Sequence, residues 1–229
     1  MCSRDTAPSW RGTSHEIMKI PKQIDIEHFR VAIFGSARIK KNDPRYNQIY
    51  NLAKMIATEG VDVVTGGGPG LMEAANKGHK EGGKSKKVQS YGLNIVLSKE
   101  QKANKHLDIK REFERFSDRL DYFMYLSNVV VVAPGGIGTM LELFYTWQLV
   151  QVKHVCNIPI ILLGKRWPEF IKWFEKWALA KKLISPEDMH AIFLADDAQE
   201  AMKVIKKTYE EFKKGNPDFC KKYKKYKID

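Results

Sequence analysis

Short apolar runs that alternate with helix-like segments are the feature of this sequence that most limits its fold. Each run ends in turn residues, and the segments between the runs repeat apolar residues at helical spacing. Runs that are apolar on both faces are typical of parallel strands, because the connecting helices cover both faces of the sheet. The sequence therefore predicts a doubly wound α/β fold with a mainly parallel sheet. The predicted strands are VAIFG, VDVVT, YGLNIVL, VVVVA, IPIILLG and AIFLA, which begin at residues 31, 61, 91, 129, 158 and 191.

Helices are predicted between and after these strands, which gives a single Rossmann-like domain with helices on both faces of the sheet. The stretch KEGGKSKKVQSYG, at residues 80–92, is rich in lysine, glycine and serine and is expected to form a flexible loop. We assign this domain to residues 25–214, a leader to residues 1–24 and a basic tail to residues 215–229. The helices are expected at residues 44–60, 71–78, about 112–127, 138–152, 167–180 and 198–214.

The composition is that of a soluble globular protein. Hydrophobic residues make up 43% and charged residues 29% of the 229 residues, and no apolar run is long enough to cross a bilayer. Cys2, Cys156 and Cys220 are widely spaced, which fits neither a disulfide framework nor a zinc site. We therefore expect a protein of the reducing cytoplasm, with no metal and no membrane partner.

Half of the net charge of +12 comes from the C-terminal segment. Residues 203–229 contain ten lysines and four acidic residues, a net of +6. A basic tail with interleaved tyrosines is compatible with nucleic-acid binding, but a solvated helix end explains it without any partner. Since nothing else in the chain resembles a nucleic-acid motif, we expect no nucleic-acid partner.

Two glycine-rich stretches follow predicted strands, at the sheet edge where such folds bind ligands. TGGGPG spans residues 65–70 and PGGIGT residues 134–139, and each leads into a predicted helix whose N-terminus favours a phosphate. The first strand-to-helix turn, FGSARIK, has a single glycine and lacks the dinucleotide fingerprint, and no P-loop sequence follows either stretch. A smaller phosphorylated ligand remains the best explanation.

Thr139 and Glu142 follow the second stretch and allow two interpretations. Their T-x-x-E spacing is that of a capping box, in which the glutamate accepts a hydrogen bond from the backbone N–H of the cap residue. The three glycines of PGGIG, however, remove side chains from a whole turn, which a cap does not require. The alternative is that a ligand approaches this backbone closely.

The order and spacing of several motifs resemble those of the LONELY GUY-type phosphoribohydrolases, a family long labelled lysine decarboxylases. The motifs are FGSAR, TGGGPGLMEAANKG, GLNI, EQKAN, an arginine at 119 and PGGIGTMLE, between residue 31 and about residue 164. The resemblance implies an enzyme that hydrolyses the N-glycosidic bond of nucleoside 5′-monophosphates, such as AMP or cytokinin ribotides, to free base and ribose 5-phosphate. It also implies a homodimer or larger homo-oligomer, and no cofactor.

By this resemblance Arg119 and Glu142 are the catalytic residues, and the second glycine turn surrounds the phosphate and ribose. Ser36 and Arg38 fit a ligand-facing turn and equally fit a cap and a solvated charge. Glu73 matches the family too, but the dipole of a helix explains it adequately. The expected substrate-binding residues are Glu100, Gly135, Gly136, Gly138, Thr139, Gly67, Gly68 and Ser36.

The chain departs from the family pattern at Leu120, where lysine is common, and at Tyr145, where an acidic residue is common. These departures bear on substrate preference more than on the bond that is cleaved. An aromatic stripe at helical spacing is expected to be core or an oligomer face. The stripe comprises Trp167, Phe170, Trp173, Phe174 and Trp177.

Two other functions are compatible with the fold. One is a carrier of molybdenum cofactor, whose phosphorylated pterin would occupy the glycine turns without requiring Glu142 or Arg119. The other is single-strand nucleic-acid binding, which would depend on salt and on the C-terminal lysines. Both glycine turns together with both charged residues favour the enzyme.

Overall fold

The computed structural model of the chain describes residues 28–96, 103–155 and 157–215. Their centre is a seven-stranded sheet in the order β4-β3-β2-β1-β5-β6-β7, in which every neighbouring pair is parallel. This sheet confirms the predicted fold class. The strands are β1 (Arg30–Phe34), β2 (Asp62–Thr65), β3 (Ser90–Ile95), β4 (Ile109–Phe113), β5 (Val129–Val132), β6 (Ile160–Leu163) and β7 (Ile192–Ala195).

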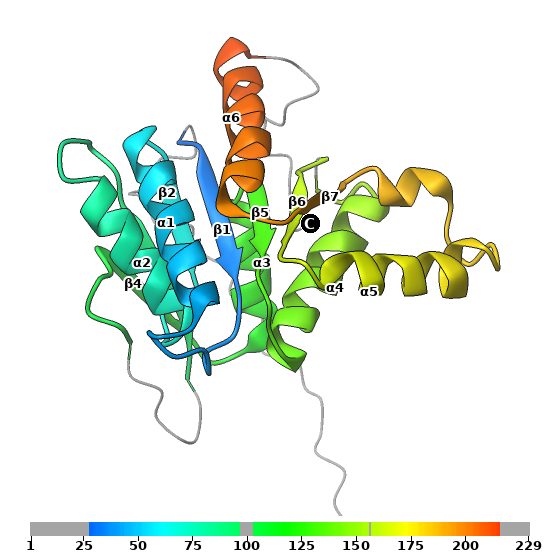
Figure 1. Cartoon of the computed structure of the whole chain (residues 1–229), viewed down its shortest axis with the longest axis horizontal. Helices are drawn as coiled ribbons and strands as arrows, with labels where there is room; N and C mark the ends of the chain where they lie inside the picture. The colour runs from blue at the N-terminus through cyan, green and yellow to red at the C-terminus, as the bar shows by residue number, and fades with distance from the viewer. Residues whose placement is uncertain (1–27, 97–102, 156, 216–229) are drawn as a thin grey trace, which may run out of the picture.

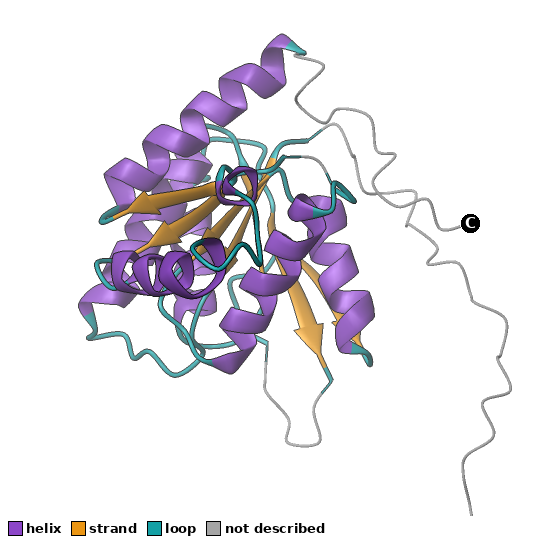
Figure 2. Cartoon of the chain, turned by 90° about the vertical axis from the view of Figure 1, so that its right-hand side faces the viewer, coloured by secondary structure: helices purple, strands orange, loops and turns teal. Residues whose placement is uncertain are grey.

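Helices cover both faces of the sheet (Figures 1 and 2). Successive strand residues point to opposite faces, so Val31 and Ile33 of β1 belong to one hydrophobic core and Ala32 and Phe34 to the other. The first core includes α1, α2 and α6, and the second includes α3, α4 and α5. The bounds of these helices are α1 (Pro44–Thr58), α2 (Leu71–Gly82), α3 (Phe116–Leu126), α4 (Ile137–Gln151), α5 (Trp167–Phe174) and α6 (Ala198–Lys214).

The helix predicted from about Glu112 is wrong at its start. Residues 109–113 form β4, parallel to β3, with Leu93 opposite Arg111, and α3 begins only at Phe116. β4 lies at the edge of the sheet and alternates partly buried and exposed residues before the buried Phe113. Charged residues are common on edge strands, where they discourage pairing with another chain. Their presence made this strand resemble the polar start of a helix.

The stretch at residues 80–92 is a loop only in its middle. Lys80 to Gly82 are the last residues of α2, and β3 begins at Ser90. A Cβ atom added at Gly82 would lie 2.3 Å from the carbonyl oxygen of Lys54 in α1. The glycine thus belongs to a close contact between two helices, which explains why a lysine- and glycine-rich sequence is helical here.

The predicted helix from Trp167 to Ala180 changes its hydrogen bonding part of the way along. α5 ends at Phe174 and continues as a π-helical segment, Glu175–Leu179, and the N–H of Ala180 donates to the Glu175 carbonyl at 2.8 Å. No helix among the described residues has the length and apolar character needed to span a membrane.

The sheet reverses its winding direction between β1 and β5, and this is where the loops form a site. β1 is followed by the loop that leads to α1, and β5 by the glycine turn that leads to α4. The N–H of Ser36 donates to the carbonyl oxygen of Pro134 at 3.2 Å and so joins the two loops.

Candidate active site

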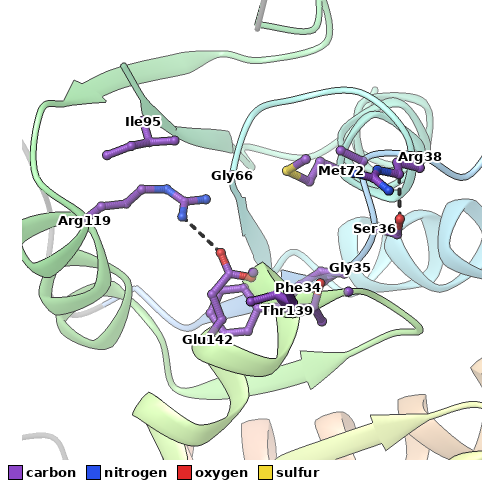
Figure 3. Close-up of a pocket in the computed structure, with 15 residues that line it drawn as sticks. Phe34, Gly35, Ser36, Arg38, Gly66, Met72, Ile95, Arg119, Thr139 and Glu142 are labelled. Carbon is purple, nitrogen blue, oxygen red and sulfur yellow. Dashed lines mark hydrogen bonds and ion pairs between the residues drawn. The ribbon is translucent and has the colours of Figure 1, made fainter. Parts of the chain in front are cut away.

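A cavity of about 470 Å³ lies at the carboxyl ends of β1 and β5 (Figure 3). The loop after β1 contributes residues 35–38, the loop after β2 contributes Gly66, and the N-cap and first turn of α4 contribute residues 136–139. Charged side chains on its wall are Arg38, Arg119 and Glu142. The sheet edge and the glycine turns therefore form the ligand-sized hollow that the sequence predicts.

Arg119 and Glu142 form a buried ion pair inside this cavity. Arg119 comes from the first turn of α3 and Glu142 from the second turn of α4, and their side chains point toward one another (Figure 3). The Nη1 group of Arg119 donates to Oε1 of Glu142 at 3.0 Å. Arg119 is 7% exposed and Glu142 9% exposed. The structure thus brings together the two residues that the family resemblance names as catalytic.

Two further contacts fix the guanidinium of Arg119. Its Nε donates to the carbonyl oxygen of Leu93 at 2.7 Å, and its Cζ lies 5.0 Å from the centre of the Phe123 ring. Among the described residues, none accepts a hydrogen bond from its remaining nitrogen, Nη2. Arg119 is therefore held rigidly while one donor is left for a ligand.

Burial raises the pKa of Glu142 above its ordinary value, while the charge and hydrogen bond of Arg119 act in the opposite direction. Desolvation is the larger of these effects, because the carboxyl group is almost entirely removed from water. A carboxylate with a raised pKa is a stronger base than an exposed one. Glu142 is therefore suited to accept a proton during a reaction.

The capping-box interpretation of Thr139 and Glu142 is wrong. α4 begins at Ile137 with Gly136 as its N-cap, and no side chain caps it. Thr139 therefore lies inside the helix, and the carboxyl group of Glu142 bonds to Arg119 instead of the helix N-terminus. The first turn of α4 contains no acidic residue, so its N–H groups and dipole are available to an anion.

The three positions of the second turn are occupied by glycine for different structural reasons. A Cβ atom at Gly135 would lie 2.1 Å from Oγ1 of Thr139, so packing within the protein excludes a side chain there. A Cβ atom at Gly136 or Gly138 would meet no atom within 4 Å, although both residues line the cavity. The protein itself leaves room for side chains at these two positions. Their absence keeps the backbone open to the cavity.

The first glycine stretch is mostly structural. Gly66 lines the cavity, and a Cβ atom there would lie 2.5 Å from Nη2 of Arg119. Gly67 and Gly68 do not line it; their carbonyl oxygens accept hydrogen bonds from the side chain of Asn104 at 3.1 and 3.0 Å. Gly67 has a φ of 70°, which favours glycine. Glu100, the other predicted contact, lies outside the described residues.

A buried polar network under this stretch was not identified from the sequence. The Asn104 side chain donates to Oδ1 of Asn76 at 2.9 Å, and the Thr65 hydroxyl donates to the same oxygen at 2.8 Å. Asn76 in turn donates to the Ser90 hydroxyl at 2.7 Å. Both asparagines belong to family motifs, AANKG and EQKAN. The motifs could therefore single out these residues, but not the hydrogen bonds that they form.

The other polar residues considered from the sequence divide between the cavity and its surroundings. Ser36 and Arg38 line the cavity, and the backbone N–H of Arg38 donates to the Ser36 hydroxyl at 3.1 Å. Glu73 lies outside it and pairs with Lys41 at 3.0 Å. Neither of the departures from the family pattern lines the cavity; Leu120 is buried, and the Tyr145 hydroxyl donates to Asp121.

A known family accounts for most of this chain. The sequence matches the family described as possible lysine decarboxylase over residues 72–205, which is more than half of the chain. A pyrimidine/purine nucleotide 5′-monophosphate nucleosidase of Escherichia coli (strain K12) is 24% identical over 190 residues, covering 78% of this chain and 40% of that protein. The chain thus spans less than half the length of the curated relatives that it matches.

Solved structures share the fold. The molybdenum cofactor carrier protein of Chlamydomonas reinhardtii has a TM-score of 0.59 and 25% identity, covering 80% of this chain and 99% of that one. The molybdenum cofactor binding protein of Rippkaea orientalis has a TM-score of 0.58 and 21% identity, covering 80% and 98%. The family match includes Arg119, Glu142 and the second glycine turn, and it confirms the family that the motifs indicate. This chain therefore belongs to the possible lysine decarboxylase family, the family of the LONELY GUY-type proteins.

Proposed function

We propose that this protein is a nucleoside 5′-monophosphate phosphoribohydrolase that acts on AMP, a cytokinin ribotide or both. The observation that carries the proposal is the buried pair of Arg119 and Glu142 in a cavity that also contains an uncapped helix N-terminus. The relative from Escherichia coli, a nucleotide 5′-monophosphate nucleosidase by name, supports the same class of reaction. No cofactor is required for this chemistry.

The reaction breaks the bond between C1′ of the ribose and a ring nitrogen of the base. The bonding electrons leave with the base, so positive charge builds on the ribose, and the carboxylate of Glu142 stabilises that charge. A water oxygen bonds to C1′ while Glu142 accepts the water proton, which then passes to the base through solvent. The products are the free base and ribose 5-phosphate.

Arg119 has two roles in this proposal. Its contact with Oε1 of Glu142 orients the carboxylate and opposes the rise in pKa that burial causes. Its Nη2 group offers a charged donor to the departing base or to the ribose hydroxyls. Both roles require the rigid placement that the Leu93 carbonyl and the Phe123 ring provide.

The 5′-phosphate is proposed to bind at the N-terminus of α4. Gly136, Gly138 and Thr139 line the cavity there, and the free N–H groups of the first turn suit a phosphate. Ile137 and Glu142 are five residues apart, which is about 7.5 Å along a helix axis. That span is comparable to the length of ribose 5-phosphate, so one helix can bind the phosphate at one end of the sugar and stabilise charge at the other.

A homo-oligomer is part of the proposal, supported by a stripe of exposed apolar residues on α4. Ile137 is 91% exposed, Leu141 44% and Phe144 39%, at positions that share one helix face. Ile137 also lines the cavity. A second copy packed on this stripe would bury it and border the site.

A molybdenum cofactor carrier is the second candidate, because solved carrier structures share the fold. A carrier binds and releases its ligand without breaking a bond. It has no need of a buried carboxylate with a raised pKa, so the Arg119–Glu142 pair favours the enzyme.

The test is incubation of the purified protein with a panel of nucleoside 5′-monophosphates, while free base and ribose 5-phosphate are measured by chromatography. The enzyme releases both products in equal amounts from at least one purine nucleotide. Release from none of them, together with molybdenum and pterin in the purified protein, would establish the carrier instead.

A further inference from the structure

Arg38 is the charged residue of the cavity that the proposed reaction does not use. It follows β1, is exposed, and lines the cavity together with Ser36 and the first turn of α4. In the view of Figure 3, Arg119 lies to the left of Glu142 and Arg38 to the right. The two arginines therefore enter the cavity from different sides.

The charges of the cavity are unequally distributed between these sides. Arg119 is neutralised by Glu142 at 3.0 Å. Within the part of the chain that the structure describes, no acidic side chain lies within ion-pair distance of Arg38. The first turn of α4 has no acidic residue and no side-chain cap, so it adds positive potential on top of this unpaired guanidinium. The excess positive charge of the cavity thus comes from Arg38 and this turn.

The loop that carries Arg38 is fixed to the rest of the site. The Ser36 N–H donates to the Pro134 carbonyl at 3.2 Å, and the Leu71 N–H donates to the Ser36 carbonyl at 3.0 Å. Gly70, with a φ of 68°, lets the start of α2 approach so closely that a Cβ atom there would lie 2.6 Å from the Ala37 carbonyl oxygen. Because the loop is held from two sides, its backbone need not become ordered when Arg38 binds a ligand.

We infer that Arg38 selects the phosphorylated substrate: its guanidinium binds the 5′-phosphate together with the N-terminus of α4, and so distinguishes nucleoside monophosphates from nucleosides. This inference rests on the proposed function and assigns Arg38 to substrate binding, with no role in bond cleavage. A phosphate dianion at this point is neutralised by the guanidinium and the helix N-terminus together. The uncharged 5′-hydroxyl of a nucleoside gains nothing from Arg38.

The test compares AMP and adenosine as ligands of Arg38→Ala, Arg38→Lys and Lys40→Ala. Lys40 is an exposed cation of the same loop that does not line the cavity, so its variant is the matched control. Affinities are measured by calorimetry in a Glu142→Gln background, which prevents turnover, and KM and kcat are measured with Glu142 present. Circular dichroism checks the folding of each variant.

Arg38→Ala is expected to weaken AMP binding about 10- to 100-fold and to leave adenosine binding within about twofold, as for the loss of one charge-assisted contact. The effect falls on KM for AMP and leaves kcat unchanged, Arg38→Lys is intermediate, and Lys40→Ala matches the parent. Equal losses for AMP and adenosine, or no loss for either, would overturn the inference while AMP hydrolysis still stands. If Arg38-dependent AMP binding is found without hydrolysis, the inference stands and the proposed function fails.

Discussion

At the scale of single residues, the site depends on a carboxyl group that is buried beside a buried cation. Burial raises the pKa of Glu142, and Arg119 at 3.0 Å opposes that rise by favouring the ionised form. The pKa of Glu142 therefore depends on two opposing effects, burial and the charge of Arg119, of which burial is the larger. A change in either residue alters this balance in a known direction.

Replacement of Arg119 by glutamine should move the pH dependence of hydrolysis to higher pH. Activity requires ionised Glu142, so kcat/KM falls as the pH drops through the pKa of this residue, which lies above the ordinary 4.5. Loss of the arginine removes the influence that lowers this pKa, so the pKa rises further and the acidic limb of the profile shifts upward. The measurement is kcat/KM for AMP against pH in both proteins.

Arg115→Gln is the matched control, because Arg115 precedes the same helix, is exposed and does not line the cavity. Its profile should coincide with that of the parent. An acidic limb that stays in place, or moves to lower pH, in Arg119→Gln would show that the limb does not report Glu142.

The sequence motifs predict which residues act, but not how they meet. Arg119 and Glu142 are 23 positions apart and on different helices, so their contact follows from the packing of α3 and α4 and not from any spacing. The T-x-x-E spacing was also compatible with a helix cap at Thr139. The structure excludes that cap, because the glycine turn makes α4 begin earlier, at Ile137. The hydrogen bonds of Asn104 were missed for the same reason, since its partners lie in distant parts of the chain.

At the scale of elements, the second glycine turn combines a structural glycine with glycines that the fold does not require. Gly135 is packed against Thr139, whereas Gly136 and Gly138 face open space. A substitution at Gly135 should therefore affect mainly the stability of the fold, and a substitution at Gly136 or Gly138 mainly ligand binding.

Gly138→Ala should keep or raise the stability of the fold and weaken substrate binding. Alanine in the first turn of α4 is favoured over glycine by about 0.5–1 kcal/mol, and the added methyl group enters the cavity. Thermal unfolding and KM for AMP are the measurements, with an increase in KM of about tenfold expected from lost phosphate contacts. Gly135→Ala is the contrasting variant and should unfold at a lower temperature. Equal effects of the two substitutions on stability would contradict this division of roles.

Gly78 marks a close approach of α1 and α2. A Cβ atom at this position would lie 2.1 Å from the carbonyl oxygen of Tyr50, and backbone cannot move aside as a flexible side chain can. Gly78→Ala should therefore lower the free energy of unfolding by about 1–3 kcal/mol in a urea titration. Lys80→Ala, an exposed change on the same helix, should leave it nearly unchanged. A Gly78→Ala protein as stable as the parent would contradict the close packing.

Element boundaries were predictable where local signals agree. Pro44 and the cap Asp43 start α1, and Asp197 caps α6 through the N–H of Glu200 at 2.9 Å. β4 was not predictable, because an edge strand has one neighbour and tolerates charges on its exposed positions. Its assignment needs the pairing with β3, which is a tertiary contact.

At the scale of the whole molecule, the parallel sheet followed from the sequence because its central strands are buried on both faces. Val129–Val132 are fully buried. A continuous apolar run of this kind fits neither an amphipathic helix nor an exposed strand. The strand order was not predicted, since it depends on crossovers that the sequence pattern does not specify. β1 and β5 are neighbours in the middle of the sheet, and their carboxyl ends lie at the site.

Leu141→Lys should reduce the size of the proposed homo-oligomer. Leu141 is 44% exposed in the middle of the apolar stripe of α4, and a charge buried in an interface between copies is costly. Light scattering after size-exclusion chromatography gives the mass of the particle. Val152→Lys, at the C-cap of the same helix and 58% exposed, is the control and should leave the mass unchanged. A parent protein with the mass of one chain would refute the homo-oligomer directly.

The most direct measurement of the central claim is the rate of AMP hydrolysis by Glu142→Gln beside Glu169→Gln, an exposed glutamate of α5. The glutamine at 142 keeps the size of the side chain and cannot accept a proton or balance positive charge on the ribose. The account predicts that Glu142→Gln lowers kcat about 10³-fold with AMP still bound, and that Glu169→Gln keeps the parent rate. Hydrolysis of AMP by Glu142→Gln at the parent rate would contradict it.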